Sequence, residues 1–256
     1  MYRQIGPDEY RKDFGLTENY QVTGFLCHGT WKREEELNNL RAALGELDIK
    51  FKLNELPAFL RNMVEIQINN KRIWFDVPYG GAMLSEYLHI ACLLGSKKNI
   101  LVGSCGGLSP KINACDCVIP SWTYGDESST RMYTPEKGDN HHFPDKSLVN
   151  NLKARLNSNL KIFEGPTITC QAMLAESWED VQKWSKEGYL GVEMEASTVF
   201  AVSNNFGVPS AALLVVGDNL IKEENVLHEN FKKLSGKRTG IRQEFLKAAI
   251  LELLEG

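Results

Sequence analysis

Two carboxylates separated by a single residue are the most informative chemical feature of this sequence. Glu193 and Glu195 flank Met194 immediately before an apolar stretch that starts at Ala196. One of them is placed to cap a helix there, because the N-terminal end of the helix dipole favours negative charge. The other is free to accept hydrogen bonds from two adjacent hydroxyl groups, which is what the cis-diol of a ribose offers.

A third carboxylate, Asp218, follows the apolar run of residues 211–216. At the end of a buried strand, desolvation raises the pKa of a carboxyl group towards neutrality. A carboxyl group with such a pKa can donate a proton as a general acid. Asp218 is therefore a candidate proton donor, and helix capping is the alternative interpretation.

Two glycine-containing segments offer contacts for an anion. Residues 103–107 read Gly-Ser-Cys-Gly-Gly, where small residues let backbone N–H groups approach an anion and Ser104 adds a hydroxyl donor. Gly29 is followed four residues later by Arg33, whose guanidinium suits phosphate. The alternatives are a tight turn at the first segment and a surface arginine paired with residues 34–36 at the second. Neither segment matches the dinucleotide or P-loop pattern, which disfavours dinucleotides and nucleoside triphosphates.

Short apolar runs alternate with amphipathic stretches along the chain, which is typical of an α/β domain with a largely parallel sheet covered by helices. We expect strands at residues 22–27, 72–77, 99–102, 117–120, 161–169 and 211–216. We expect helices at residues 32–44, 84–94, 147–156, 177–186, 196–205 and 243–254. In open α/β sheets ligands bind beyond the carboxyl ends of the strands, which directs attention to residues 27–30, 102–107 and 215–219.

The sequence shows no internal repeat, no linker and no break in composition, so we expect one domain over residues 1–256 with residues 1–20 as an N-terminal extension. Residues 127–144 are polar and rich in turn formers, and they favour a surface excursion over an active-site loop. Within them, His141 and His142 are more typical of solvated histidines than of metal ligands.

Composition narrows the class of protein. With 29 basic and 33 acidic residues the net charge is −4, which excludes a strongly basic nucleic-acid binder. No apolar run approaches the roughly 20 residues of a membrane helix, and the polar N-terminus resembles neither a signal nor a transit peptide. The pair Cys115 and Cys117 lacks a second ligand pair at zinc spacing, so we expect no metal and six reduced thiols. These features predict a cytoplasmic protein.

Taken together, these residues resemble the nucleoside phosphorylase family, which contains hexameric purine nucleoside phosphorylases, uridine phosphorylases and methylthioadenosine nucleosidases. The resemblance runs from about residue 22 to the C-terminus. Its most specific element is the stretch of residues 192–196, Val-Glu-Met-Glu-Ala, and residues 102–106 look like the family's phosphate loop. It implies a three-layer fold with a central mixed, largely parallel sheet covered by helices.

The resemblance also implies roles for single residues. Gly29, Arg33 and Ser104 would contact phosphate, with Arg61 reaching in from a neighbouring subunit. Glu193, Met194 and Glu195 would form the ribose site, and Gln171 and Met173 would lie against the base. Asp218 would protonate the leaving base with Arg238 as its partner. The implied activity is cleavage of the N-glycosidic bond of a nucleoside by phosphate, giving the free base and ribose 1-phosphate in purine salvage. Phosphate is the co-substrate, and no cofactor is implied.

Three departures from the family pattern keep alternatives open. Leu101 occupies the position where the phosphorylases carry an arginine. The hydrolytic nucleosidases also lack that arginine. No counterpart exists for the N-terminal histidine that reaches the 5′-hydroxyl of a neighbour's nucleoside. The usual Pro-Gly-Asp-Pro of the first loop is replaced by residues 28–31, His-Gly-Thr-Trp.

Because Arg33 and Arg61 remain, phosphorolysis is favoured over hydrolysis. Met173 stands in place of the uracil-binding arginine of uridine phosphorylases, so a purine is favoured over uridine. A non-catalytic nucleoside-binding protein on the same scaffold is the third alternative. Nucleoside and phosphate are the expected partners. If Arg61 completes a neighbour's site, the minimal unit is a homodimer, with the family's hexamer as the larger form.

Overall fold

A mixed β-sheet forms the centre of the molecule in the computed structural model, which describes residues 1–134, 140–227 and 229–255. Its ten strands are β1 (Gly24–His28), β2 (Lys52–Glu55), β3 (Val64–Ile68), β4 (Lys71–Asp76), β5 (Asn99–Gly107), β6 (Cys117–Tyr124), β7 (His141–His142), β8 (Ile162–Thr169), β9 (Gly191–Glu193) and β10 (Ser210–Asn219). The strand order is β10-β6-β8-β9-β5-β1-β4-β3-β2, with β7 on β6 and a further pairing of β10 with β5. Strands β5, β10, β6, β8 and β9 therefore close into a ring, from which β1 to β4 extend as an open sheet.

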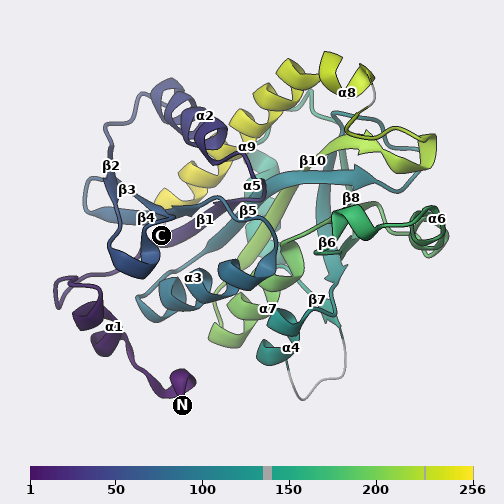
Figure 1. Cartoon of the computed structure of the whole chain (residues 1–256). Helices are drawn as coiled ribbons and strands as arrows, with labels where there is room; N and C mark the ends of the chain where they lie inside the picture. The colour runs from purple at the N-terminus through teal and green to yellow at the C-terminus, as the bar shows by residue number, and fades with distance from the viewer. Residues whose placement is uncertain (135–139, 228, 256) are drawn as a thin grey trace.

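Helices cover the sheet on both sides (Figure 1). They are α1 (Pro7–Asp13), α2 (Arg33–Glu46), α3 (Gly81–Leu93), α4 (Ser128–Tyr133), α5 (Lys146–Arg155), α6 (Trp178–Lys186), α7 (Ala196–Phe206), α8 (Glu229–Lys233) and α9 (Ser235–Leu254). Side chains of α2, α5 and α9 form one core cluster with the sheet, and those of α3 and α7 form a second one. The α/β three-layer fold with a mixed sheet is thus confirmed.

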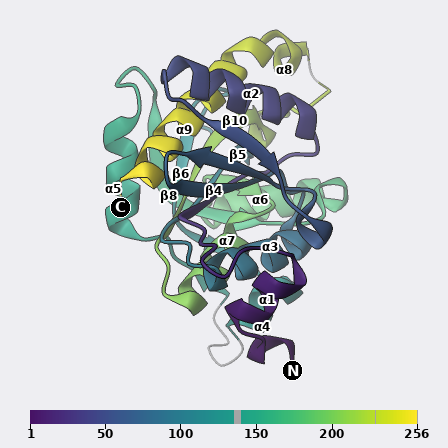
Figure 2. The ribbon, with the colours of Figure 1, turned by 90° about the vertical axis from the view of Figure 1, so that its left-hand side faces the viewer.

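The N-terminal segment lies against the α3 side of the molecule, where Figure 2 shows α1 beside α3. It is anchored by Phe14 and Tyr20, which are buried in the second cluster. No helix among the described residues is both long enough and apolar enough to cross a membrane.

Every strand and helix expected from the sequence is present, but three strands run further than expected, among them β6, which continues to Tyr124. β5 continues through residues 103–107, and β10 continues through Asp218 to Asn219. The tight turn that was the alternative interpretation of the glycine segment is therefore not formed: the segment is a strand, because it pairs with β10 on one side and with β9 on the other. Glycine at 106 and 107 permits this, since a Cβ at either position would press on Leu220 or Val216.

Residues 127–144, which were expected to be the least structured part of the chain, contain some regular secondary structure. Within residues 127–144 the structure contains α4 and β7, while residues 135–139 lie outside the described part of the chain. His142 is 3% exposed and its Nε2 lies 3.1 Å from the carbonyl oxygen of Gly125, so its prediction as a solvated histidine is wrong. His141 is exposed, as expected.

A buried ionic network fixes the end of β1 to two helices. His28 Nδ1 lies 3.0 Å from Glu36 Oε2 of α2, and Arg242 Nη1 of α9 lies 3.4 Å from Glu36 Oε1. The Glu36 side chain is fully buried, and Asn39 Nδ2 donates to it over 2.9 Å. Burial raises the pKa of Glu36, but His28 and Arg242 outweigh it and hold the pKa below its ordinary value. The network therefore needs the ionised form of Glu36.

Replacing Glu36 by Gln should lower the free energy of unfolding by about 3 kcal/mol at neutral pH, because Arg242 then loses its buried counter-charge and keeps only the more exposed Glu35. The pKa of Glu36 is lowered on folding, so its contribution is present above the ordinary value of 4.5 and is lost as the pH falls further. Urea unfolding at pH 7 and pH 4 measures both effects. The matched control is Glu46→Gln on the same helix, an exposed partner of Lys247 that should change stability by less than about 1 kcal/mol. Equal losses in both variants would contradict the network's role.

Candidate functional site

The two predicted anion segments meet at one edge of the sheet. β1 and β5 are parallel neighbours with His28 opposite Val102, and the N–H of Gly29 donates to the Val102 carbonyl oxygen over 3.1 Å. A Cβ on Gly103 would lie 3.8 Å from the Gly29 nitrogen. Ser104 is exposed although its strand lies inside the sheet, so its hydroxyl is available to a ligand at this edge.

Glu195 lies directly over Gly29. A Cβ added at Gly29 would stand 2.3 Å from Glu195 Oε2, a distance that no side chain tolerates. The N–H of Gly80 donates to Glu195 Oε1 over 2.7 Å, and the side chain is 5% exposed. Burial, followed by the charge of Glu193, raises the pKa of Glu195 to about 8. The carboxylate predicted for a ribose therefore lies beside the backbone predicted for phosphate.

Both carboxylate oxygens of Glu193 accept hydrogen bonds from the protein itself. Its Oε2 accepts the N–H groups of Glu195 and Ala196 over 2.7 and 2.6 Å, and its Oε1 accepts the hydroxyl of Thr169. Its side chain is the cap of α7 that the sequence predicted for one of the two carboxylates. The helix cap thus occupies Oε2, and a contact of Glu193 with a ribose stays a prediction.

Asp218 is placed by an irregularity in β10. The register against β5 shifts between Val216 and Asp218, so Gly217 is an extra residue that re-aims the side chain after it. Asp218 is 8% exposed. Burial raises its pKa to about 6, and the charge of Arg238 opposes that rise. A carboxyl group with this pKa can hold a proton near neutrality, as the sequence predicted.

Arg238 acts on Asp218 through space. Its guanidinium lies 3.7 Å from the ring centre of Phe231 and donates to the carbonyl oxygen of Phe231. Arg238 and Asp218 do not form a direct ion pair in the described structure. Arg238 Nη1 is buried without a hydrogen-bond partner in the described structure, so one donor of this cation remains available.

The two other predicted cations line one hollow. Arg33, the first residue of α2, donates from Nε to the Asn62 carbonyl oxygen over 3.2 Å and from Nη1 to Glu34 over 3.1 Å. Arg61 follows the short 3-10 helix η2 (Ala58–Leu60) and is exposed. Both arginines, together with Arg41, line a hollow of about 540 Å³. The pairing of Arg33 with Glu34 that the sequence offered as an alternative is present, and it leaves the guanidinium partly exposed.

Leu101 lies in register with Cys27 of the neighbouring strand β1. Its side chain is fully buried in the core cluster of α3 and α7, beside Cys27 and Leu214. Because Leu101 is apolar, Arg33 and Arg61 are the predicted cations that remain for an anion.

The predicted base-binding residues lie in the loop after β8. Gln171 Nε2 would be 2.3 Å from a Cβ at Gly81, and it is buried without a hydrogen-bond partner among the described residues. Gln171 is therefore near the start of α3, on the Glu195 side of the site. Met173 begins the 3-10 helix η3 (Met173–Ala175) and is half-buried, as is Met194 between its two carboxylates.

Two carboxylates near the site were missed by the sequence reasoning. Asp76 ends β4, and Glu176 follows η3, where burial and then the charge of Asp218 raise the pKa of Glu176 to about 7. Asp76 carried a usable signal, because it is a charged residue at the end of an apolar strand, as Asp218 is. Glu176 carried none, since only the folding of the loop brings it near Asp218.

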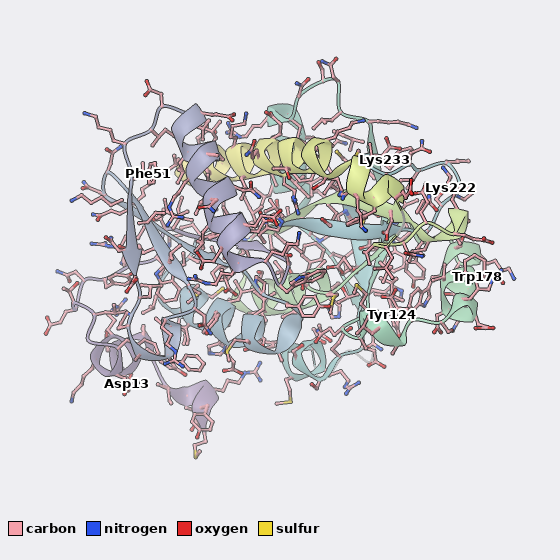
Figure 3. The ribbon with its side chains drawn as sticks, turned by 45° about the horizontal axis from the view of Figure 1, so that its top comes forward. Asp13, Phe51, Tyr124, Trp178, Lys222 and Lys233 are labelled. Carbon is pink, nitrogen blue, oxygen red and sulfur yellow. The ribbon has the colours of Figure 1, made fainter. Side chains whose placement is uncertain are left out.

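The other candidate ligands show no sign of metal chemistry. All six cysteines are free thiols, and most are buried. No group of three or more His, Cys, Asp or Glu side chains in the described parts of the chain is arranged to hold a metal ion. Figure 3 shows Lys222, directly after β10, at the same end of the molecule as Trp178 and Tyr124, far from Asp13.

Comparison with known proteins gives a consistent result. The model of the Phosphorylase superfamily matches residues 70–251. The chain is 31% identical over 136 residues to a DeoD-type purine nucleoside phosphorylase of Clostridium beijerinckii, covering 51% of this chain and 55% of that one. It is 29% identical over 129 residues to a guanosine phosphorylase of Halorubrum lacusprofundi, covering 50% and 53%. These matches span about half the length of the two relatives.

A solved structure extends the likeness to nearly the whole chain. The uridine phosphorylase of Vibrio fischeri ES114 superimposes with a TM-score of 0.73 over 93% of both chains at 20% identity, which shows a shared fold. A DeoD-type purine nucleoside phosphorylase of Dichelobacter nodosus is 24% identical over 78% of both sequences. The family match covers well over half of the chain. This protein therefore belongs to the phosphorylase superfamily.

Proposed function

We propose that this protein cleaves the N-glycosidic bond of a purine nucleoside with inorganic phosphate, giving the free base and ribose 1-phosphate. The observation that carries the proposal is the contact of Glu195 with Gly29. It joins a carboxylate suited to a ribose diol to a backbone segment suited to an anion, next to the exposed hydroxyl of Ser104. The proposal treats residues 1–256 as one domain with this single site.

The reaction needs a proton at one end of the site and an anion at the other. As the bond between C1′ and the base breaks, its electron pair moves to the base and positive charge develops on the sugar. Asp218 donates a proton to the base, and a phosphate oxygen at Gly29, Arg33 and Ser104 forms the new bond to C1′. Glu195 holds the two ribose hydroxyls, so the sugar is positioned between the acid and the anion.

Phosphorolysis is favoured over hydrolysis by the retained cations. Arg33 and Arg61 line one hollow, Arg33 four residues after Gly29 in the chain, and both are exposed enough to meet an anion. The hydrolytic alternative is supported by Leu101, because its buried apolar side chain removes one positive charge from the phosphate end. Inorganic phosphate distinguishes the two reactions.

A purine is favoured over uridine by the proton donor and by the base loop. Asp218 suits a purine, since N7 of the base can take the proton. The half-buried Met173 offers an apolar surface to a ring and no donor to uracil. Relatives with partial matches are named as purine and guanosine phosphorylases, whereas the fold is shared with a uridine phosphorylase.

A homodimer is proposed as the minimal active unit, with a hexamer as the larger form. Arg61 adjoins the exposed side chains of Phe59 and Met83 around a second hollow of about 330 Å³. A second copy covering this apolar surface would bring its own Arg61 to the neighbouring site.

The test of the proposal is base release from inosine, guanosine, adenosine and uridine with and without phosphate. We expect turnover of at least one purine nucleoside only when phosphate is present, with ribose 1-phosphate as the second product. Equal rates without phosphate would establish hydrolysis, and turnover of uridine alone would establish a pyrimidine enzyme. No turnover of any nucleoside would support a binding protein.

Replacing Asp218 by Asn should lower kcat for inosine by about 10²–10⁴-fold, because the leaving base no longer receives a proton. The matched comparison uses 7-methylguanosine, whose base already carries a positive charge and leaves without protonation. Its kcat should fall much less. Initial rates with both nucleosides measure the contrast, and similar losses on both would show that Asp218 has another role.

The pH dependence should report the same proton. Because the protonated form of Asp218 is the active one, kcat/KM for the nucleoside should fall as the pH rises through about 6. The charge of Arg238 lowers the pKa of Asp218, so Arg238→Met should raise that pKa and move the fall to higher pH. Profiles at saturating phosphate measure the shift. A fall that stays in place would separate Arg238 from the acid.

A further inference from the structure

Asp76 is a buried carboxylate whose bonding is incomplete. It is the last residue of β4 and is 2% exposed, yet its Oδ2 has no hydrogen-bond partner among the described residues. The backbone N–H of Val77 is the hydrogen bond that favours its ionised form. A buried carboxylate with an unpaired oxygen is costly, so its presence calls for an explanation.

The position of Asp76 relates it to the proposed anion site. β4 pairs in parallel with β1, and Cys27 lies opposite Asp76 in the register. Gly29 lies two residues beyond Cys27, directly after the end of β1. Cys27 belongs to the core cluster on the α3 side, and the alternation of β4 directs Asp76 towards that side as well.

The charged and titratable groups that act on Asp76 come from every neighbouring element. Arg33 of α2 is the cation that opposes its protonation, and Glu195 at the start of α7 is the nearby like charge. Cys27 of β1 and Tyr87 of α3 are the neutral titratable neighbours, and the charge of Asp76 raises the pKa of both. Burial raises the pKa of Asp76 to about 7 against the opposing charge of Arg33, so the protonated and ionised forms are both present at neutral pH.

We propose that Asp76 is a further residue of the anion site, and that phosphate binds to the form of the protein in which the Asp76 carboxyl group carries a proton. This inference rests on the proposed function, because it takes the anion to lie at Gly29, Arg33 and Ser104. An ionised Asp76 would repel a dianion and draw Arg33 towards itself. A neutral Asp76 removes that repulsion and offers one hydroxyl donor from its unpaired oxygen.

The sign of the pH dependence follows from the proton that the complex holds. Binding to the protonated form takes up a proton, so the affinity for an anion is highest below the pKa of Asp76. It falls as the pH rises through that pKa, by at most about tenfold per pH unit for one group. Glu195 adds a fall of its own at higher pH, which remains when Asp76 is replaced.

Sulfate is the probe, because its double charge does not change near neutrality, whereas phosphate itself titrates there. Isothermal titration calorimetry of the full chain with sulfate at about pH 6 and pH 8 measures the affinity without any need for turnover. With Asp76→Asn we expect wild-type affinity at the lower pH and about tenfold tighter binding than wild type at the higher pH. Asp76→Ser should give the same flattening, which guards against a misfolded single variant.

The control is Glu65→Gln on the adjacent strand β3. Glu65 is also a buried carboxylate, but it accepts hydrogen bonds from Tyr20 and from Asn54 Nδ2 over 2.8 Å. Its substitution should leave the sulfate affinity and its pH dependence as in the wild type. Titrations at pH 7 in two buffers with different ionisation enthalpies should show proton uptake that Asp76→Asn reduces and Glu65→Gln does not.

Three results would overturn the inference. Weaker sulfate binding by Asp76→Asn at both pH values would show that an ionised Asp76 orients Arg33. An unchanged pH dependence would show that Asp76 does not sense the anion, and no sulfate binding by the wild type would remove the anion site. Because the nucleoside panel measures turnover separately, an enzyme that needs phosphate but lacks this pH dependence would retain the proposed function and lose this inference.

Discussion

The contact between the Glu195 carboxylate and the backbone of Gly29 is the constraint on which the rest of the site depends. The carboxylate occupies the space where any side chain at position 29 would begin, and the N–H of Gly80 holds its other oxygen. Gly80 has φ of 87°, a left-handed conformation that glycine adopts without strain. One side chain thereby fixes the end of β1, the start of α3 and the start of α7 against one another. Glu193 makes this possible by capping α7, which leaves Glu195 for a ligand.

The sheet supplies the remaining positions through its register. Four neighbouring parallel strands, β4, β1, β5 and β10, run in the same direction. β4 ends at Asp76, Gly29 follows β1, and Ser104 and Asp218 lie within the longer strands β5 and β10. The register staggers these residues along the strands, since Asp76 lies level with Leu101 whereas Asp218 lies opposite Gly106. The extra residue Gly217 re-aims the carboxyl group of Asp218 while its strand stays paired with β5. Regular pairing and one irregularity together determine the spacing between acid and anion.

Much of this could be predicted from the sequence, because the informative signals are local. Each strand and helix expected from apolar periodicity is present in the structure. The position of Asp218 after an apolar strand predicted its raised pKa. The division of roles between Glu193 and Glu195 could not be assigned, since it depends on Thr169 and Gly80 from distant segments. β2 was missed because it is short, none of its residues is buried and it lacks a clear alternation. β3 was missed although four of its five residues are buried. The continuation of β5 through its glycines was missed because turn-forming residues can also pair when neighbouring strands lie on both sides.

The net charge of −4 does not show how the buried carboxyl groups and the arginines of the site offset one another. Burial is the first cause of the raised pKa of Asp76, Glu195 and Asp218, which reach about 7, 8 and 6. The cations Arg33 and Arg61 lie at the more exposed rim, where water weakens their effect on the buried acids. In the proposed reaction the two substrates act on these acids in opposite directions. A ribose diol that donates to Glu195 favours its ionised form and releases a proton, whereas an anion beside Asp76 favours the protonated form and takes one up. When both substrates are bound the two effects offset each other, so the site can take a neutral nucleoside and a dianion with little net exchange of protons with the solvent. A buried site with fewer titratable carboxyl groups would have to meet the added charge with more buried cations, each of which carries its own cost of desolvation.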